Sequence, residues 1–334
     1  MPYQDIPLTD LHRHLDGNVR LETMLDLAQQ HGLEMPGWDV ESLRPHAQVV
    51  GKIADLTACL PKFALMQSVM VDYDACRRIA WENLEDAVNE GIDYIELRFS
   101  PGFMAEVHQL DPAGVTSAVC EAWEEARDRL TVKARLIVIM SRHYGPEACQ
   151  AELDVAIAHR DRGVVGIDIA GVEDAGPGHL FVSHVRQARE AGLHVTVHAG
   201  EWSGPESVRQ AVVELEAERL GHAIGAKDDP AVMDLLIERS VAIESCPTSN
   251  VQFSMVPGYQ AHPLPMWLER GLLVTVNTDD PGISGIDLPH EYRVLRDEMH
   301  LGDEPIRQLQ ANGVTAAFLT AAERKALWQA KRAP

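Results

Sequence analysis

The first residues able to do metal chemistry lie near the amino terminus, in the stretch LTDLHRHLDGN, residues 8–18. His12 and His14 are two positions apart, so in an extended strand their side chains point to the same face. Asp16 follows at the same spacing. Neutral imidazoles are common ligands of transition metals. An HxH pair alone fits a structural role equally well, so a metal site needs further ligands elsewhere in the chain.

Such groups follow three later β-like runs, which end in VTVHAGE, LGHAI and VTVNTDDPG. These runs present His198 and Glu201, then His222, and finally Asp279 and Asp280. Taken singly, a buried histidine is usually a hydrogen-bonded core residue, and aspartate before Pro-Gly is ordinary turn chemistry. Taken together, so many ionisable groups would be costly to bury without a metal ion or mutual pairing.

The set predicts a hydrolytic metal centre. His12, His14, His198 and one carboxylate supply three nitrogens and one oxygen, which suits Zn²⁺ with a position left for water. Zinc lowers the pKa of such a water from 15.7 toward about 7, so hydroxide becomes available at neutral pH.

Three further side chains then have roles in hydrolysis. His222 could orient the water or take its proton, Asp280 could accept a hydrogen bond from it, and Glu201 could donate a proton to the substrate. Other catalytic signatures are absent from the sequence, including GxSxG, GxxxxGK[ST] and the HxE…PCxxC pattern of cytidine-type zinc deaminases.

The elements that must position these groups read as alternating strands and helices. Short apolar runs are expected to form strands at residues 7–12, 92–100, 133–141, 164–171, 194–200, 219–224, 241–246 and 272–280. Helical patterns lie between them, as at 112–130 and 205–218, where Pro205 and Glu206 suit a first turn. The pattern predicts a TIM-type (β/α)8 barrel, whose strands share one mouth at their carboxyl ends.

Extra helices are expected at about residues 21–90 and after Pro289, all within a single domain spanning 1–334. An open doubly wound sheet is the alternative fold, but no GxGxxG follows the first strand.

The amino-acid composition limits the kinds of molecule that the protein is expected to bind. The 334 residues include 29 Lys plus Arg against 51 Asp plus Glu, a formal net charge of -22. This charge opposes nucleic acids and anionic membranes and favours a small neutral or cationic partner. Five cysteines without a CxxC pair argue against structural disulfides, and we expect a cytoplasmic protein without a membrane span. The oligomeric state cannot be predicted.

The motifs HRHLDGN, ELRFSPG, IDIAG, VHAGE, GHAI, SCPTSN and NTDDPG occur in that order, and with them the chain closely resembles adenosine deaminases of the amidohydrolase superfamily. The resemblance implies a barrel with one Zn²⁺ that hydrolyses the 6-amino group of a purine nucleoside in purine salvage. It implies zinc ligands His12, His14, His198 and Asp279; catalytic Glu201, His222 and Asp280; and substrate contacts from His14, Asp16, Gly171 and Asp280. Glu201 would protonate purine N1, and the Gly171 backbone would meet N3.

Several details of the resemblance bear on the substrate. Asp16 in HxHLDG resembles the ribose ligand of nucleoside deaminases, whereas adenine deaminases of the superfamily usually carry HxHLEG. No lysine lies between Lys133 and Lys227, so the lysine-bridged two-metal centre of related enzymes is not expected. Val172 stands where the family often has an acidic residue.

Three hypotheses follow from the sequence. The first is deamination of adenosine and 2′-deoxyadenosine, and the second is deamination of free adenine or a 5′-modified adenosine. The third is a non-catalytic zinc or nucleoside-binding barrel. An apolar gate is expected at Leu56, Cys59, Leu60 and Phe63, with Cys59 widening the mouth. We expect Met140 to form a pocket wall and His143 to be a surface or structural residue.

Overall fold

The computed structural model describes residues 2–54 and 58–332. Eight parallel strands pair in chain order to form one sheet. The strands are β1 (Thr9–His14), β2 (Tyr94–Phe99), β3 (Lys133–Ser141), β4 (Val164–Ala170), β5 (His194–Ala199), β6 (Arg219–His222), β7 (Ala242–Ser245) and β8 (Val274–Val276). Each predicted run therefore overlaps a strand, but β1 extends to His14, two residues beyond the run predicted at 7–12.

The sheet closes where the chain after β8 meets β1. The Asp279 N–H donates to the His12 carbonyl at 2.8 Å, and the His14 N–H donates to the Asp279 carbonyl at 2.8 Å. A parallel bridge joins Arg13 to Asp279. The (β/α)8 barrel is thus confirmed, and the open doubly wound sheet is wrong.

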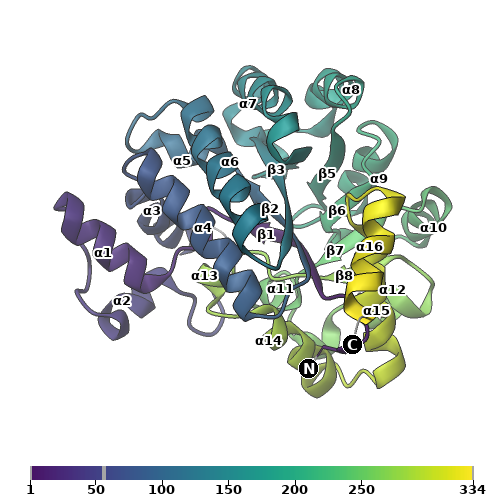
Figure 1. The fold of residues 1–334 in the computed structure, drawn as a ribbon. Helices are drawn as coiled ribbons and strands as arrows, with labels where there is room; N and C mark the ends of the chain where they lie inside the picture. The colour runs from purple at the N-terminus through teal and green to yellow at the C-terminus, as the bar shows by residue number, and fades with distance from the viewer. Residues whose placement is uncertain (1, 55–57, 333–334) are drawn as a thin grey trace.

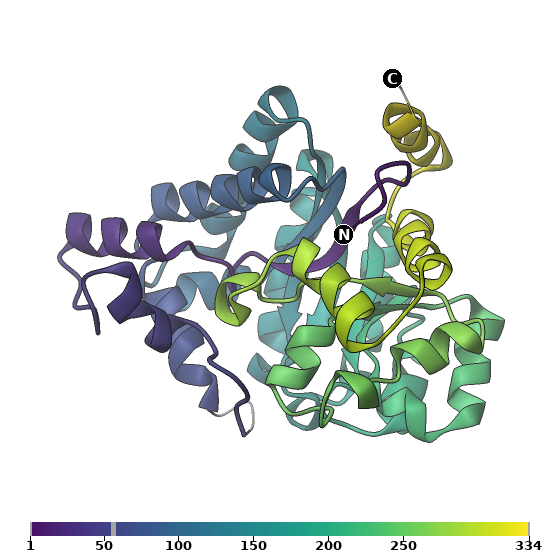
Figure 2. The ribbon, with the colours of Figure 1, turned by 90° about the horizontal axis from the view of Figure 1, so that it is seen from below.

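The predicted extra helices are also confirmed: α1–α4 lie between β1 and β2, and α15 and α16 follow the barrel at the opposite side in Figures 1 and 2. The helices are α1 (Leu21–His31), α2 (Val40–Ala47), α3 (Leu60–Ser68), α4 (Tyr73–Asn89), α5 (Pro101–Glu106), α6 (Pro112–Arg129), α7 (Pro146–Ala158), α8 (Val182–Glu190), α9 (Pro205–Val213), α10 (Pro230–Arg239), α11 (Pro247–Gln252), α12 (Leu264–Glu269), α13 (Pro281–Ser284), α14 (Leu288–Arg293), α15 (Asp303–Ala316) and α16 (Ala321–Arg332).

Two other predicted boundaries are wrong by several residues. The helix expected at 205–218 ends at Val213, and Glu216 adopts a left-handed φ of 47° as the chain turns into β6. The strand expected at 272–280 spans only Val274–Val276, and the chain beyond it turns at Asp279, whose φ is 67°. A left-handed backbone is incompatible with both a helix and an extended strand, so each element stops before it.

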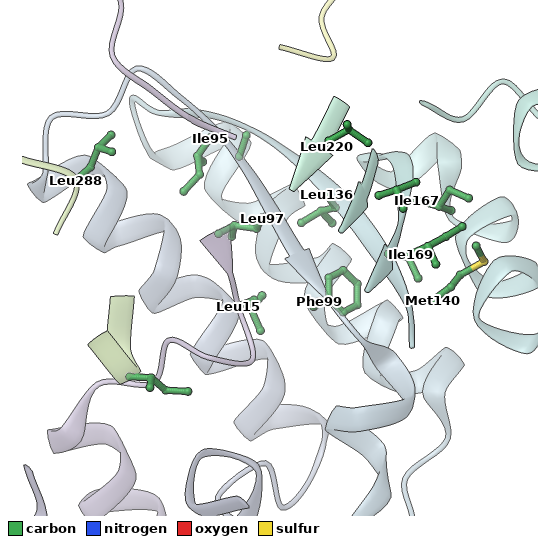
Figure 3. Close-up of a cluster of buried hydrophobic side chains, with 14 of the residues drawn as sticks. Leu15, Ile95, Leu97, Phe99, Leu136, Met140, Ile167, Ile169, Leu220 and Leu288 are labelled. Carbon is green, nitrogen blue, oxygen red and sulfur yellow. The ribbon is translucent and has the colours of Figure 1, made fainter. Parts of the chain in front are cut away.

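Side chains alternate along the strands between two environments. On β2, Ile95, Leu97 and Phe99 are fully buried in the apolar layer beneath the helices, which Figure 3 shows. Glu96 and Arg98 lie on the other face, toward the barrel interior, where they pair with charged residues from other strands. The barrel therefore has an apolar outside and a charged inside, and this inside carries the site.

Three smaller findings bear on the predictions. Met140 is fully buried in the apolar cluster and does not line the pocket described below, so its predicted place as a pocket wall is wrong. All five cysteines are buried and free. Among the described residues, no helix combines the length and the apolarity that crossing a bilayer requires.

Candidate active site

The structure brings four residues from β1, β5 and the end of β8 together at the barrel mouth: His12, His14, His198 and Asp279. One ligand atom from each lies within 4.8 Å of the others. His12 Nε2 and His14 Nε2 lie 3.2 and 3.4 Å from Asp279 Oδ1. His14 Nε2 and His198 Nε2 face each other at 3.4 Å. These four residues form the metal-ligand cluster.

Buried carboxylates orient two of the three histidines. His12 Nδ1 lies 2.7 Å from Glu244 Oε2, and His198 Nδ1 lies 3.0 Å from Asp168 Oδ2. Because an ionised carboxylate can only accept, each Nδ1 carries the proton and each Nε2 lone pair is directed into the cluster. His12 Nε2 is buried and has no hydrogen-bond partner among the described residues. An unpartnered lone pair in this position fits a metal ligand.

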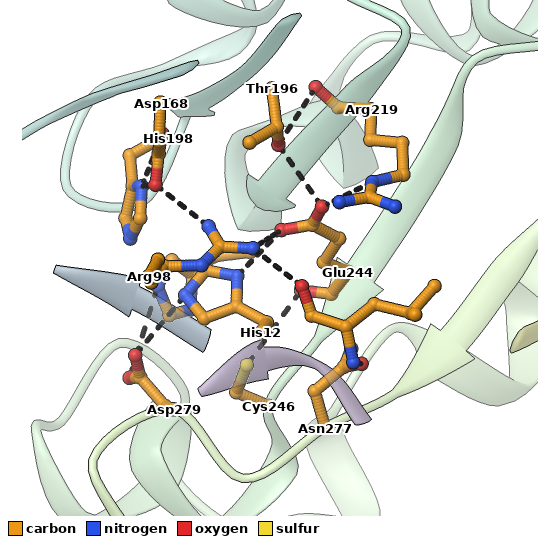
Figure 4. Close-up of polar contacts among 12 residues, drawn as sticks. His12, Arg98, Asp168, Thr196, His198, Arg219, Glu244, Cys246, Asn277 and Asp279 are labelled. Atoms are coloured by element: carbon orange, nitrogen blue, oxygen red, sulfur yellow. Dashed lines mark hydrogen bonds and ion pairs between the residues drawn. The ribbon is translucent and has the colours of Figure 1, made fainter. Parts of the chain in front are cut away.

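Arginines hold those carboxylates ionised, as Figure 4 shows. Arg98 donates to Asp168 and to Glu244, both at 2.7 Å, and Arg219 donates to Glu244 at 2.7 Å. Burial would raise the pKa of Glu244, but these two guanidinium groups hold it well below its usual range. Arg98 therefore connects the partners of both ligand histidines. The sequence analysis missed this layer, although charged residues inside apolar strands signal it.

Two residues of the site have a left-handed backbone conformation, which sets the direction of their side chains. His222 ends β6 with φ 63°, and Asp279 has φ 67°, conformations that non-glycine residues rarely adopt. Such backbone is found where the surrounding structure enforces it, commonly at functional sites. His222 Nε2 consequently lies 3.9 Å from Asp279 Oδ2 and 3.8 Å from Glu201 Oε1. Ser249, which the sequence analysis missed, donates to Asp279 Oδ2 at 2.6 Å.

Glu201 sits in a loop held by a second glutamate. The Glu173 carboxylate accepts the backbone N–H groups of residues 200–203 at 2.8–3.2 Å, together with the Ser207 hydroxyl. Burial, with the nearby negative charges of Asp279 and Glu173, raises the pKa of Glu201 well above its usual value. Burial therefore favours the protonated form of Glu201, which could give its proton to a bound molecule.

Asp280 shares the floor of the site with the cluster. Burial and the neighbouring Asp279 raise its pKa, and its Oδ1 has no hydrogen-bond partner among the described residues. A Cβ on Gly17 would come within 1.6 Å of that oxygen. Glycine at position 17 is therefore required for Asp280 to occupy its place.

These residues open into one cavity of about 420 Å³. Asp16 lines it, is 6 % exposed, and accepts the Ser100 N–H through Oδ2 at 2.9 Å. Gly171 also lines it, with φ 96°, and a Cβ there would lie 2.5 Å from His143 Nδ1. His143 itself lines the cavity, so its assignment away from the site is wrong. It comes there because the turn Arg142–Tyr144 directly follows β3.

Of the four residues predicted to form an apolar gate, two line the cavity. Leu60 and Phe63 line the cavity, whereas Leu56 lies outside the described residues. Cys59 is fully buried and does not line the cavity, so it does not widen the mouth as expected. Val172 lines the rim and is 44 % exposed, which places an apolar contact where the family often has a charge.

Comparison with known proteins agrees with this geometry. Residues 7–331 match the adenosine deaminase family. An adenosine deaminase of Escherichia coli O7:K1 is 51 % identical over 322 residues, which cover 96 % of each chain. The chain belongs to the adenosine deaminase family.

Two solved structures share the fold. An adenine deaminase from Arthrobacter aurescens has a TM-score of 0.90 and 26 % identity over 98 % of both chains. An amidohydrolase from Burkholderia ambifaria with bound Zn has a TM-score of 0.87 and 26 % identity, covering 98 % of this chain and 89 % of that one.

Proposed function

We propose that this member of the adenosine deaminase family binds one Zn²⁺ per chain and hydrolyses adenosine and 2′-deoxyadenosine to inosine and 2′-deoxyinosine, releasing ammonia. The observation that carries the proposal is the metal-ligand cluster at the floor of a cavity whose wall holds Glu201, a carboxyl group whose pKa is raised by burial. The 51 % sequence identity with an adenosine deaminase, over 96 % of the chain, supports the same reaction.

The donor set of the cluster fits zinc. His12, His14 and His198 offer imidazole nitrogens and Asp279 offers a carboxylate oxygen, a combination that suits a catalytic Zn²⁺. When bound, zinc lowers the pKa of a water molecule and so supplies hydroxide at neutral pH. The amidohydrolase with bound Zn is a structural relative in which that metal is present.

The remaining residues account for the proton and oxygen transfers. Glu201 protonates purine N1, which makes C6 electrophilic, and water oxygen forms a bond to C6. The bond from C6 to the amino nitrogen then breaks. One of the two water protons leaves with that nitrogen as ammonia, the other returns to Glu201, and the product keeps a C6 carbonyl and a proton on N1. Asp280 and His222 flank the attacking oxygen and hold it by hydrogen bonds. The Gly171 backbone, free of a side chain, lies against the ring at N3.

The cavity favours a nucleoside over a nucleotide. Among the described residues that line it there is no lysine or arginine, the side chains that bind phosphate. A 5′-phosphate would also meet a protein with a formal net charge of -22. Asp16 Oδ2 accepts the Ser100 N–H, and Asp16 Oδ1, which lies 3.7 Å from His14 Nδ1, is the oxygen that a ribose hydroxyl would meet. Free adenine is the second candidate, because an adenine deaminase shares the fold closely.

A substrate panel on protein of measured metal content tests the proposal. We expect loss of absorbance near the adenine maximum with adenosine and 2′-deoxyadenosine. With adenine, kcat/KM should be at least about tenfold lower, because the groups that bind the ribose are left unpaired. With adenosine 5′-monophosphate it should be lower by about as much, because no lysine or arginine lines the described cavity to bind the phosphate. Absence of turnover with one zinc bound would contradict the function. Glu201→Gln should retain zinc and lose most turnover, and near-normal turnover would reject its role.

The wider setting is also proposed. We propose that residues 1–334 act as one domain, in the cytoplasm and on a small purine nucleoside, without nucleic-acid or membrane partners. The strongly acidic composition and the extended apolar layer around the barrel support this.

A further inference from the structure

His222 is connected to a hydrogen-bonded chain on the side away from the metal-ligand cluster. Its Nδ1 lies 3.0 Å from Asn250 Nδ2, and Asn250 Oδ1 lies 3.0 Å from His262 Nε2. His262 Nδ1 in turn lies 3.1 Å from the backbone nitrogen of Leu264. His222, Asn250 and His262 are 1 %, 0 % and 4 % exposed. We call these three residues the His–Asn–His relay.

The direction of every hydrogen bond in the relay follows from its last member. A backbone N–H can only donate, so His262 Nδ1 accepts from Leu264 and carries no proton. Burial lowers the pKa of His262 to about 3, so the ring is neutral and its single proton is on Nε2. His262 therefore donates to Asn250 Oδ1.

The amide of Asn250 passes this direction on to His222. With Oδ1 accepting from His262, the NH₂ group faces His222 Nδ1 and donates to it. A second observation supports this orientation: the Met255 sulfur, a weak acceptor, lies 3.1 Å from the same Nδ2. His222 Nδ1 is thus an acceptor.

We propose that His262 and Asn250 are positioning residues that hold His222 as the tautomer with its proton on Nε2. That proton is directed toward Glu201 Oε1 and Asp279 Oδ2, the side from which the attacking oxygen approaches. This inference rests on the proposed function, and it decides between the two roles open to His222, which are to orient the water or to take its proton. It donates a hydrogen bond to the oxygen, and Nε2 is not free to take that oxygen's proton.

Nitrogen NMR of the histidines tests the tautomer directly. Two-bond ¹H–¹⁵N correlations on the zinc-loaded full chain, labelled at its 15 histidines, distinguish a protonated from an unprotonated ring nitrogen. The His222 signals are assigned by their loss in His222→Gln. We expect Nε2 protonated and Nδ1 unprotonated in both His222 and His262. A proton on His222 Nδ1 would overturn the proposal.

Substitutions then separate positioning from mere packing. Asn250→Asp offers only acceptors, so it should move the His222 proton to Nδ1 and lower kcat on the order of 10²-fold with little change in KM. His262→Gln keeps a donor for Asn250 and should keep the tautomer and most of the rate. His262→Leu removes the donor and should populate both tautomers with a kcat about tenfold or more lower. His46→Leu, at an exposed position, is the control.

The outcomes distinguish this proposal from the proposed function. If His222 carries its proton on Nε2 but no aminopurine is turned over, the relay stands and the function fails. If adenosine is turned over while His262→Leu leaves both the tautomer and kcat unchanged, the relay is wrong and the function stands. Should Asn250→Asp not fold, the two His262 variants still decide, because one is expected to retain the tautomer and the other to lose it.

Discussion

Replacing Glu173 by glutamine would test how the catalytic loop is held. The substitution keeps the shape of the side chain and removes its charge. In the native protein one carboxylate oxygen accepts the N–H groups of residues 201–203, and the other accepts the Gly200 N–H at 2.8 Å and the Ser207 hydroxyl. A glutamine must place an NH₂ donor at one of these two positions. The orientation that faces Gly200 takes the carboxylate acceptor from that one N–H, leaves it only the Ser207 hydroxyl oxygen at 3.3 Å, and is the less costly one.

The magnitude follows from these contacts. A buried donor left without an acceptor costs about 1–3 kcal/mol, and each bond that changes from a charged to a neutral acceptor loses roughly 1 kcal/mol. With three such bonds at the other oxygen, the free energy of unfolding should fall by about 4 kcal/mol. At roughly 2–4 °C per kcal/mol, Tm should drop by about 10 °C. A displacement of the Glu201 backbone by ~1 Å would lower kcat on the order of 10²-fold.

Thermal unfolding and adenosine turnover measure the two effects. Glu206→Gln, which removes the same charge from a side chain that is 86 % exposed, is the matched control and should change neither quantity appreciably. If Glu173→Gln unfolds within about 2 °C of this control and keeps its kcat, the Glu173 carboxylate does not hold the loop, and the reasoning is refuted.

Two further predictions concern buried charges. Arg98→Met leaves Asp168 and Glu244 without the guanidinium group that joins them. The free energy of unfolding of the metal-free protein should therefore fall by about 3–5 kcal/mol, and zinc should bind about 10- to 100-fold more weakly. A zinc titration that matches that of the native protein would count against this. Burial raises the pKa of Glu152 to about 7 from 4.5, so the native state binds a proton more tightly than the unfolded state. As pH rises from 4.5 to 7, the free energy of unfolding of the native protein should therefore fall by about 3 kcal/mol relative to that of the Glu152→Gln variant. Parallel stability curves across this range would exclude the effect.

Much of the fold could be predicted because parallel barrel strands are buried on both sides. The run KARLIVIMS at 133–141 is observed as β3 without a shift, since its apolar side chains leave few alternatives. Boundaries were less predictable where they depend on single backbone angles. Nothing in the composition near Glu216 signals its left-handed φ, which ends the helical pattern early.

The residues of the candidate site also differ in whether they could be predicted from the sequence. Residues that follow strand ends, such as His198 and Asp280, could be found because the fold alone places them at a shared mouth. Residues that act across the barrel could not, because their partners are far away in the sequence: Arg98 meets Glu244 across 146 positions. A usable signal was nevertheless present, since Glu244 in AIES is a charge in an otherwise buried strand.

The charges inside the barrel are better explained by function than by stability. A buried ion pair often stabilises a protein less than apolar residues of similar volume would, so its presence is weak evidence for a stabilising role. Among the described residues, the network that joins the partners of the metal-ligand cluster contains four carboxylates and two guanidinium groups, so within this network carboxylates exceed guanidinium groups by two: Glu96, Asp168, Glu244, Asp279, Arg98 and Arg219. The two positive charges of a divalent cation at the metal-ligand cluster would balance that difference. The arginines pair with the carboxylates, the carboxylates orient two histidines of the cluster, and the cluster could therefore hold a cation.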